Sequence, residues 1–250
     1  MGAVLLLLLT LASACGARGV PAATEPPATA PLFGTALDGP VPSDILDARL
    51  VDGHGHATSL GALHGKVIVL SDFMTQCAEV CPIGTASMLQ AARQIDGTPL
   101  GAHVVFVSLT IDPIRDDARH LRAYQRTYGH RDDWMVLGGS RTVVDRVWRR
   151  LGIWIHQTRN SKPYPRDWVT DQPLTTDLSH TDELIFIDGD QRFRYELDGT
   201  GTVGSARRIP RRIYHFMDAL GHRNVTNPPA GGWSPGQVTN VVRWLTGGAS

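Results

Sequence analysis

The sequence predicts an α/β fold with a mixed sheet flanked by helices. Apolar runs of strand length alternate with amphipathic segments of helix length between residues 66 and 151. Two further apolar runs, separated by Asp188-Gly189-Asp190, predict a late β-hairpin. Cys77 and Cys81 come soon after the first apolar run, at a strand–helix junction. A cysteine pair at this position makes the predicted fold thioredoxin-like.

The first elements in chain order are a hairpin, a strand and a helix. Residues 50–60 contain Asp52-Gly53, which favours a tight hairpin turn. Residues 66–70 form a short apolar run without polar alternation, as in a strand buried on both faces. Residues 83–95 carry apolar side chains at helical spacing, which predicts a helix.

The middle of the chain repeats this alternation. Residues 103–109 predict a second buried strand, and residues 116–128 predict an amphipathic helix that ends at Gly129. Residues 134–137 read as a short strand. Ser140 is a suitable N-cap for a helix over 140–151.

The last third combines regular elements with two irregular stretches. The late hairpin is expected over 183–187 and 192–197, and a final amphipathic helix over 235–245. Residues 156–179 and 199–232 are polar or rich in Pro, Gly and Arg, so we expect them to be long loops inserted into the domain.

The beginning of the chain resembles an export signal. Residues 1–14 are expected to be a signal peptide. The apolar run over 3–14 is too short to span a bilayer as a helix, and it ends in small residues before Cys15. This pattern resembles a bacterial lipobox, which predicts a lipidated Cys15 and a protein tethered to the extracytoplasmic face of the cell membrane. An ordinary cleaved signal, giving a periplasmic or secreted protein, is the alternative. Residues 15–43 are expected to be a flexible linker and residues 44–250 the folded domain.

The composition excludes one class of partner. The formal net charge is +0, with 24 basic and 24 acidic residues. A strongly basic surface is the usual signature of a nucleic-acid-binding protein, so we expect no nucleic-acid partner.

Cys77 and Cys81 are the strongest candidates for a functional site. A spacing of four residues places both sulfurs on one side of a helix start. Two thiols so placed can form a disulfide or hold one soft metal ion, and the residues themselves leave both uses open. An exported location permits the disulfide.

Three motifs resemble the SCO/SenC family of thioredoxin-fold, copper-binding proteins. They are Phe73-x-Thr75-x-Cys77-x-x-Val80-Cys81-Pro82, the strand end Ser108 to Asp116 with Asp112-Pro113-x-Arg115, and the segment Leu60 to Lys66. The resemblance covers roughly residues 44–197. It implies that Cys77, Cys81 and His180 bind one copper ion, although Ser179 stands where the family usually has Asp.

The resemblance also implies a function. Such a protein delivers copper to the binuclear copper centre of a terminal oxidase, or maintains the thiols of that centre, so its partner is the copper-receiving oxidase subunit. The alternative is a thiol–disulfide oxidoreductase in which Cys77 is the nucleophile and Cys81 the resolving thiol, without metal. Whether the protein is an enzyme therefore stays open.

Two further expectations concern histidines. His180 should lie beside Cys77 and Cys81, because the strand after the cysteine motif and the late hairpin are expected to be neighbours. His54 and His56 offer either a second metal site or two exposed histidines in a turn, and the sequence favours the turn.

Overall fold

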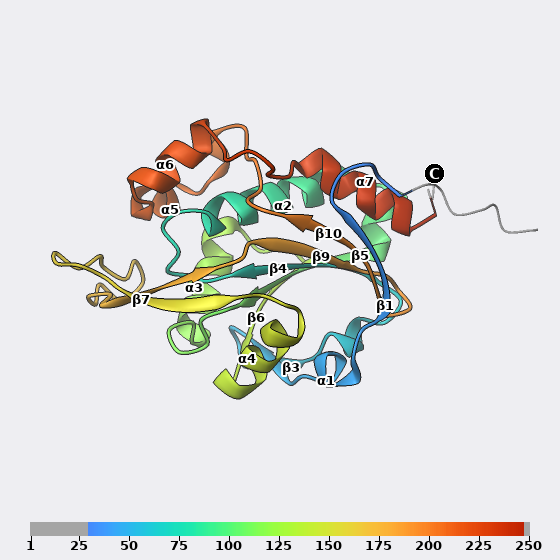
Figure 1. Ribbon diagram of the computed structural model, residues 1–250, viewed down its shortest axis with the longest axis horizontal. Coiled ribbons are helices and arrows are strands. Elements are labelled where there is room, and N and C mark those ends of the chain that lie inside the picture. Colours follow the sequence, from blue (N-terminus) through green and yellow to red (C-terminus); the bar gives the residue numbers. More distant parts are fainter. Residues whose placement is uncertain (1–29, 248–250) are drawn as a thin grey trace, which may run out of the picture.

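The computed structural model describes residues 30–247 (Figure 1). In chain order the elements are β1 (Thr35–Pro40), α1 (Ser43–Leu46), β2 (Leu50–Asp52), β3 (Ala57–Thr58), η1 (Gly61–Leu63), β4 (Val67–Phe73), α2 (Cys81–Ile95), η2 (Pro99–His103), β5 (Val104–Thr110), α3 (Ala118–Tyr128), β6 (Trp134–Gly139), α4 (Arg141–Arg150), β7 (Ile155–Arg159), β8 (Thr176–His180), β9 (Glu183–Ile187), β10 (Arg192–Asp198), η3 (Ala206–Arg208), α5 (Arg211–Phe216), α6 (Ala219–Thr226) and α7 (Pro235–Leu245).

The elements build a mixed sheet flanked by helices, as the sequence predicted. The strand order is β1-β10-β9-β4-β5-β6-β2-β3. Strands β4, β5 and β6 are parallel, whereas β9 pairs antiparallel with β4 on its other side. Helices α2 and α7 cover one face and α1 and α4 the other (Figure 1). This is the thioredoxin-like arrangement.

The core follows from the apolar runs. Every residue of β4 and of β5 is buried, because helices cover both faces of these central strands. The largest fully buried side chains include Trp134, Trp148 and Phe186. Helix α7 begins with a capping box in which Ser234 accepts the Gln237 N–H and Gln237 accepts the Ser234 N–H.

The folded domain begins before residue 44. Residues 35–40, which the sequence assigned to a linker, form β1 and pair antiparallel with β10 at the sheet edge. Most of β1 is exposed, so it lacks the buried apolar alternation by which a strand is recognised in a sequence. Residues 1–14 and Cys15 lie outside the described residues.

The stretch over 156–179 is not a simple loop. Strands β7 and β8 pair antiparallel, with Ile155 opposite His180 and Arg159 opposite Thr176. Both strands are largely polar and form a sheet of their own, separate from the main sheet. Their pairing satisfies the backbone without burying an apolar face, so the residue pattern gave little sign of it.

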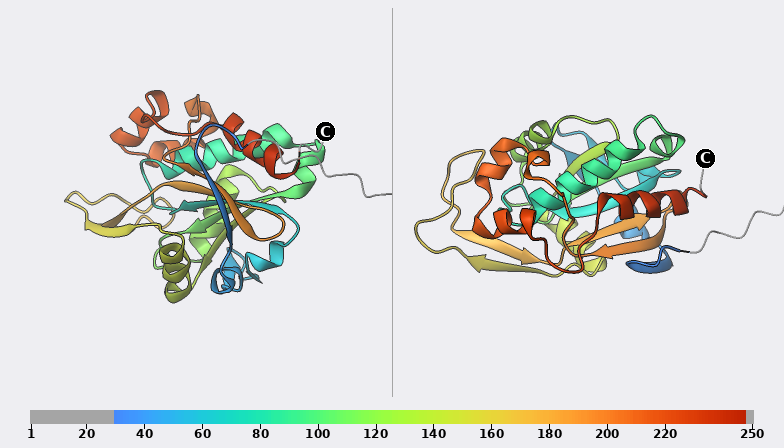
Figure 2. Two further views of the ribbon diagram at one scale, coloured as in Figure 1. Left: turned by 45° about the vertical axis from the view of Figure 1, so that its right-hand side comes forward. Right: turned by 90° about the horizontal axis from the view of Figure 1, so that it is seen from above.

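The stretch over 199–232 contains two short helices, α5 and α6. Asp218 caps α6 by accepting the Gly221 N–H at 2.7 Å. A Cβ on Gly221 would lie 2.3 Å from the Ala78 carbonyl oxygen, so α6 packs directly on the cysteine loop. Figure 2 shows α5, α6 and the β7–β8 hairpin at the same end of the molecule as the start of α2.

None of the helices within residues 30–247 is long and apolar enough to cross a membrane.

Candidate metal centre

Cys77 and Cys81 lie at the end of the central strand β4. The chain leaves β4 at Phe73, passes through a loop that contains Cys77, and enters α2 at Cys81. Both residues are 5% exposed and both are free thiols. The Cys81 N–H donates to the Cys77 Sγ at 3.2 Å. The start of α2 therefore directs one of its unpaired N–H groups at a sulfur atom.

His180 lies beside the cysteines, as expected. Its Nε2 is 3.8 Å from the Cys81 Sγ, and its side chain is only 4% exposed. The predicted strand neighbour was wrong, however: we expected the late hairpin to lie beside the strand after the cysteine motif. The late hairpin neighbours β4, the strand before the cysteine motif, because the crossover through α2 carries β5 to the opposite side of β4.

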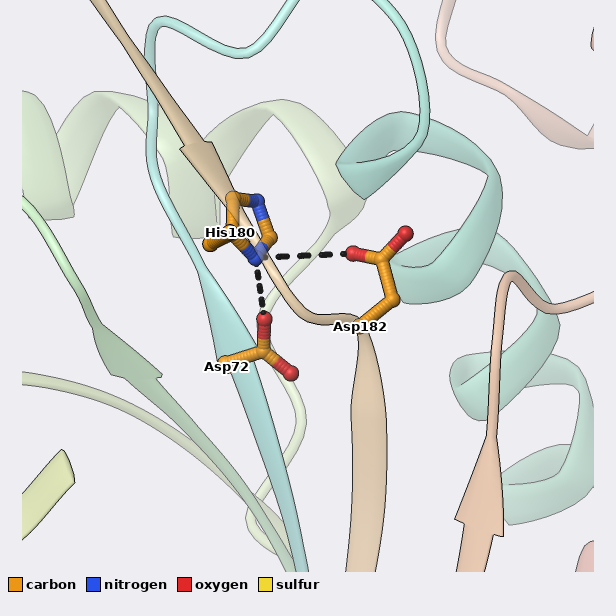
Figure 3. Close-up of side chains that lie close together, drawn as sticks. All are labelled: Asp72, His180 and Asp182. Carbon is orange, nitrogen blue, oxygen red and sulfur yellow. Dashed lines mark ion pairs between the residues drawn. The ribbon is translucent and has the colours of Figure 1, made fainter. Parts of the chain in front are cut away.

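Only acceptors surround the other ring nitrogen of His180. An Asp72 carboxylate oxygen lies 2.7 Å from Nδ1 and an Asp182 oxygen 3.6 Å (Figure 3). The Thr181 carbonyl oxygen lies 2.9 Å from the same nitrogen. The Thr181 carbonyl and the Asp72 carboxylate, the two nearest oxygens, accept, so the proton belongs on Nδ1. This arrangement aims Nε2 at the sulfurs and fixes the tautomer that leaves Nε2 as the ligand atom in the neutral ring.

Asp72 connects His180 to the sheet. Its side chain is 2% exposed, and its second oxygen accepts the Glu183 N–H at 3.0 Å. One buried carboxylate thus holds both the imidazole and the first residue of β9. Sequence reasoning missed Asp72 and Asp182. The available signal was an acidic residue inside an apolar strand, because a buried carboxylate requires a partner.

Other segments hold the cysteine loop in place. The buried Asp116 carboxylate accepts the Thr75 hydroxyl at 2.5 Å and its N–H at 3.1 Å. Trp168 donates its indole N–H to the Thr75 carbonyl at 2.6 Å, and Asp218 donates its N–H to the Ala78 carbonyl at 3.0 Å. The loop is therefore fixed from the start of α3, from the β7–β8 region and from α6.

Asp116 stood in the strand-end motif, but nothing in the sequence showed what it contacts. Gln76 makes a further link by donating to Asp167 at 3.2 Å, and His120 contacts the other Asp167 oxygen at 2.9 Å. Asp167 and Trp168 lie in the stretch that was expected to be a loop. Their role follows only from the folded chain.

The electrostatics of the centre favour a thiolate beside an imidazolium. Burial opposes the charged ring, but Asp72 and Cys77 outweigh it and raise the pKa of His180 to about 11. Burial also opposes a thiolate at Cys77, yet the Cys81 thiol and His180 hold the pKa of Cys77 well below its ordinary value. Burial and the neighbouring Cys77 thiolate raise the pKa of Cys81 well above its ordinary value.

Two carboxyl groups near the centre have pKa values above their ordinary range. Burial, followed by the charge of Asp72, raises the pKa of Asp182 to about 7. Burial, Asp218 and Cys77 raise the pKa of Glu79. These shifts show that further negative charge beside the Cys77 thiolate is unfavourable, whereas a cation bound there would relieve the repulsion.

The donor set suits a soft ion. Asp72, His180 and Asp182 form an acidic group around Nδ1, whereas Nε2 faces the Cys81 sulfur and the ring also interacts with Cys77. The oxygens therefore orient the ring, and the sulfurs and Nε2 provide two thiolates and one imidazole. This combination is typical of Cu(I).

The other two histidines that the sequence offered as possible ligands lie elsewhere. His54 and His56 are exposed in the turn between β2 and β3, at the far edge of the sheet. Met74 is buried, and its Sδ accepts a weak hydrogen bond from Arg115 at 3.7 Å.

A thioredoxin-like sheet with a Cys-x-x-x-Cys pair and an oriented histidine defines a class of thioredoxin-fold protein with a thiol and imidazole centre. Residues 47–215 match the sequence model of the SCO1/SenC family. The match covers more than half of the chain, and the chain therefore belongs to the SCO1/SenC family.

Individual relatives are distant. The chain is 25% identical over 174 residues to the human protein SCO2 homolog, mitochondrial. The aligned part covers 70% of this chain and 60% of the human protein. It is similar in fold to a candidate electron transfer protein from Aquifex aeolicus, with a TM-score of 0.51 and 22% identity over 76% of this chain and 98% of that one. Arabidopsis thaliana ScoI, whose structure has copper bound, matches with a TM-score of 0.47 and 18% identity over 66% of this chain and 88% of that one.

The thiolate–imidazolium pair leads to a measurable pH dependence. In Cys81→Ser protein, the thiolate absorbance of Cys77 near 240 nm should persist below the pH at which an ordinary thiol is protonated. Adding His180→Asn removes the positive charge and should move that step to higher pH by about 1–3 units, the range expected for one opposite charge in contact. His156→Asn, an exposed histidine on β7, is the matched control. An unchanged step in the His180 variant would contradict the pairing.

Proposed function

We propose that this protein is an extracytoplasmic copper-binding protein that supplies copper to the binuclear copper centre of a terminal oxidase. The observation that carries the proposal is the orientation of His180. Its Nδ1 is occupied by Asp72 and Thr181, and its Nε2 faces the sulfur of Cys81 at 3.8 Å. A dithiol exchange reaction does not require an imidazole held in this way.

Cu(I) fits the three donors by its chemistry. It accepts soft thiolates and an imidazole in a three-coordinate site. Zn(II) in a structural site takes four protein ligands, and no third cysteine lies near the centre within residues 30–247. The Asp72 carboxylate would act through His180 by raising the basicity of the ligand nitrogen.

Binding of the ion would be coupled to proton release. The raised pKa of His180, about 11, means that the ring of the metal-free protein carries a proton on Nε2 as well as on Nδ1 at neutral pH. Cu(I) would replace the Nε2 proton and the proton of Cys81. Affinity should therefore fall as the pH decreases, because protons compete for the same atoms.

Family membership supports the biological setting, and the receiving protein in this proposal is the oxidase subunit that carries the binuclear centre. The same dithiol could instead keep the thiols of that centre reduced. A metal-independent thiol–disulfide oxidoreductase is the second candidate. It is favoured by the lowered pKa of Cys77, since a thiolate that receives an N–H from Cys81 is an effective nucleophile.

We further propose that Cys15 carries a lipid anchor, which would hold the domain at the extracytoplasmic face of the membrane. The small residues before Cys15 motivate this proposal. Cys15→Ser should release the protein from the membrane fraction of the producing cells. A wild-type protein that is already soluble, with an intact mass lacking acyl chains, would contradict the anchor.

Competition for Cu(I) against a chelator tests the function. Asp72→Asn should weaken binding by roughly 10–100-fold, as expected for a group that orients a ligand. His180→Ala should weaken it more, because a ligand atom is lost. Oxidation of Cys77 and Cys81 to a disulfide should abolish binding. His130→Ala, an exposed histidine beside Asp132, is the control and should bind like the wild type.

The same proteins distinguish the second candidate. If the chain is primarily an oxidoreductase, disulfide reduction should depend on Cys77, and His180→Ala protein should keep this activity once the pH is high enough to form the Cys77 thiolate. Equal Cu(I) affinity in reduced and oxidised protein, or no Cu(I) binding together with rapid disulfide reduction, would overturn the copper proposal.

A further inference from the structure

The turn between β2 and β3 presents two imidazoles on the surface, away from the cysteine centre. His54 and His56 alternate with glycines in Asp52-Gly53-His54-Gly55-His56. The strands β5 and β6 lie between β4 and β2 in the sheet. With a strand spacing of about 4.8 Å, roughly 14 Å of sheet separates this turn from the strand that leads to Cys77.

The two rings already lie side by side. Their centroids are 6.0 Å apart and their planes are inclined by 24°. With metal–nitrogen bonds of about 2 Å, two imidazoles that share one ion have centroids roughly 4.5–6.3 Å apart. The observed separation falls within this range. Rotation of the two exposed side chains would still have to bring one nitrogen of each ring to a common ion.

Asp52 orients one of the two ligands. Its Oδ2 lies 3.0 Å from the His56 Nδ1, and this carboxylate places the ring proton on Nδ1 and leaves Nε2 toward solvent. The His56 side chain is 81% exposed, so Nε2 is open to an incoming ion. The His54 ring has no hydrogen-bond partner among residues 30–247, and both of its nitrogens are available.

The backbone of the turn is fixed before any ion arrives. The Asp52 Oδ1 accepts the N–H groups of His54 at 2.7 Å and of His56 at 2.9 Å. Arg122 on α3 donates to the Gly53 carbonyl, which ties the turn to the helix. Gly55 adopts φ +87°, a conformation that a side chain would strain. A fixed turn loses little conformational freedom when its side chains bind.

We propose that Asp52, His54 and His56 form a second metal site that takes one divalent transition-metal ion, with His54 and the His56 Nε2 as ligands and Asp52 as the orienting carboxylate. Imidazole nitrogens are borderline donors, and among divalent ions they bind Cu²⁺ more tightly than Zn²⁺. Water would complete the coordination. The site differs in chemistry from the cysteine centre, because it offers no thiolate and requires no reduced state.

The test is a Cu(II) titration of the full chain with Cys77→Ser, Cys81→Ser and His180→Asn, which removes the thiol and imidazole centre. We expect one equivalent of Cu(II) to bind, with electron paramagnetic resonance showing coupling to two nitrogens. Adding His54→Asn and His56→Asn should abolish binding, and adding Asp52→Asn should weaken it roughly 10–100-fold. His130→Asn is the matched control, because His130 is also an exposed histidine beside an aspartate.

If circular dichroism shows that the triple variant is unfolded, a second comparison tests the proposal. Wild-type protein should bind one more equivalent of Zn(II) than His54→Asn/His56→Asn protein, in which the cysteine centre is intact. Equal stoichiometry in this pair would overturn the site. Two results with the folded triple variant would also overturn the site. One is Cu(II) binding that persists after His54→Asn and His56→Asn are added, and the other is no Cu(II) binding before they are added.

Discussion

Asp72 lies in a strand that is buried along its whole length, so its carboxylate has to find partners inside the protein. It finds them where the chain passes from β8 into β9, the neighbour of β4: the carboxylate contacts the ring of His180, the last residue of β8, and the N–H of Glu183, the first residue of β9. Leaving such a group unpaired would cost several kcal/mol, on the order expected for breaking a buried ion pair. The position of His180 is therefore tied to the pairing of β4 with β9.

The contact between Asp72 and His180 determines which ring nitrogen faces the sulfurs. A carboxylate and a carbonyl at Nδ1 leave Nε2 as the only ring atom that can face the sulfurs. The positive ring in turn stabilises the Cys77 thiolate, and that thiolate raises the pKa of Cys81. The metal-free centre holds a thiolate–imidazolium pair, and in the proposed function the same residues would provide three donors for a soft ion. A single buried carboxylate supports both states, because it pairs with the charged ring and orients the neutral one.

The surrounding segments restrict the movement of the cysteine loop. Asp116, Trp168 and Asp218 each hold a backbone or hydroxyl group of residues 75–78, and they come from three separate parts of the chain. Two of those parts, the β7–β8 region and α6, belong to stretches that looked like loops. Both parts pack on the loop that carries Cys77. The α5–α6 segment also buries Ile213 and Met217 against Ile83 of α2.

The sequence predicted the parts of the protein that depend on local pattern. The apolar runs marked the central strands, Ser140 and Gly129 marked helix ends, and α7 was expected over the residues it occupies. Cys77 and Cys81 were recognisable by spacing, and His180 by its family resemblance.

The contacts of Asp72 and Asp116 were not predictable, since each depends on residues distant in the chain. Strands β1, β7 and β8 were missed because an exposed or polar strand lacks a buried alternation.

X-ray absorption at the copper edge tests the central claim most directly. Protein loaded with one equivalent of Cu(I) should show two sulfur ligands at about 2.3 Å and one nitrogen ligand at about 2.0 Å, by analogy with zinc bond lengths. The nitrogen contribution should disappear in His180→Ala protein. A coordination shell of nitrogen and oxygen alone, or a nitrogen contribution that persists in the His180 variant, would contradict the account.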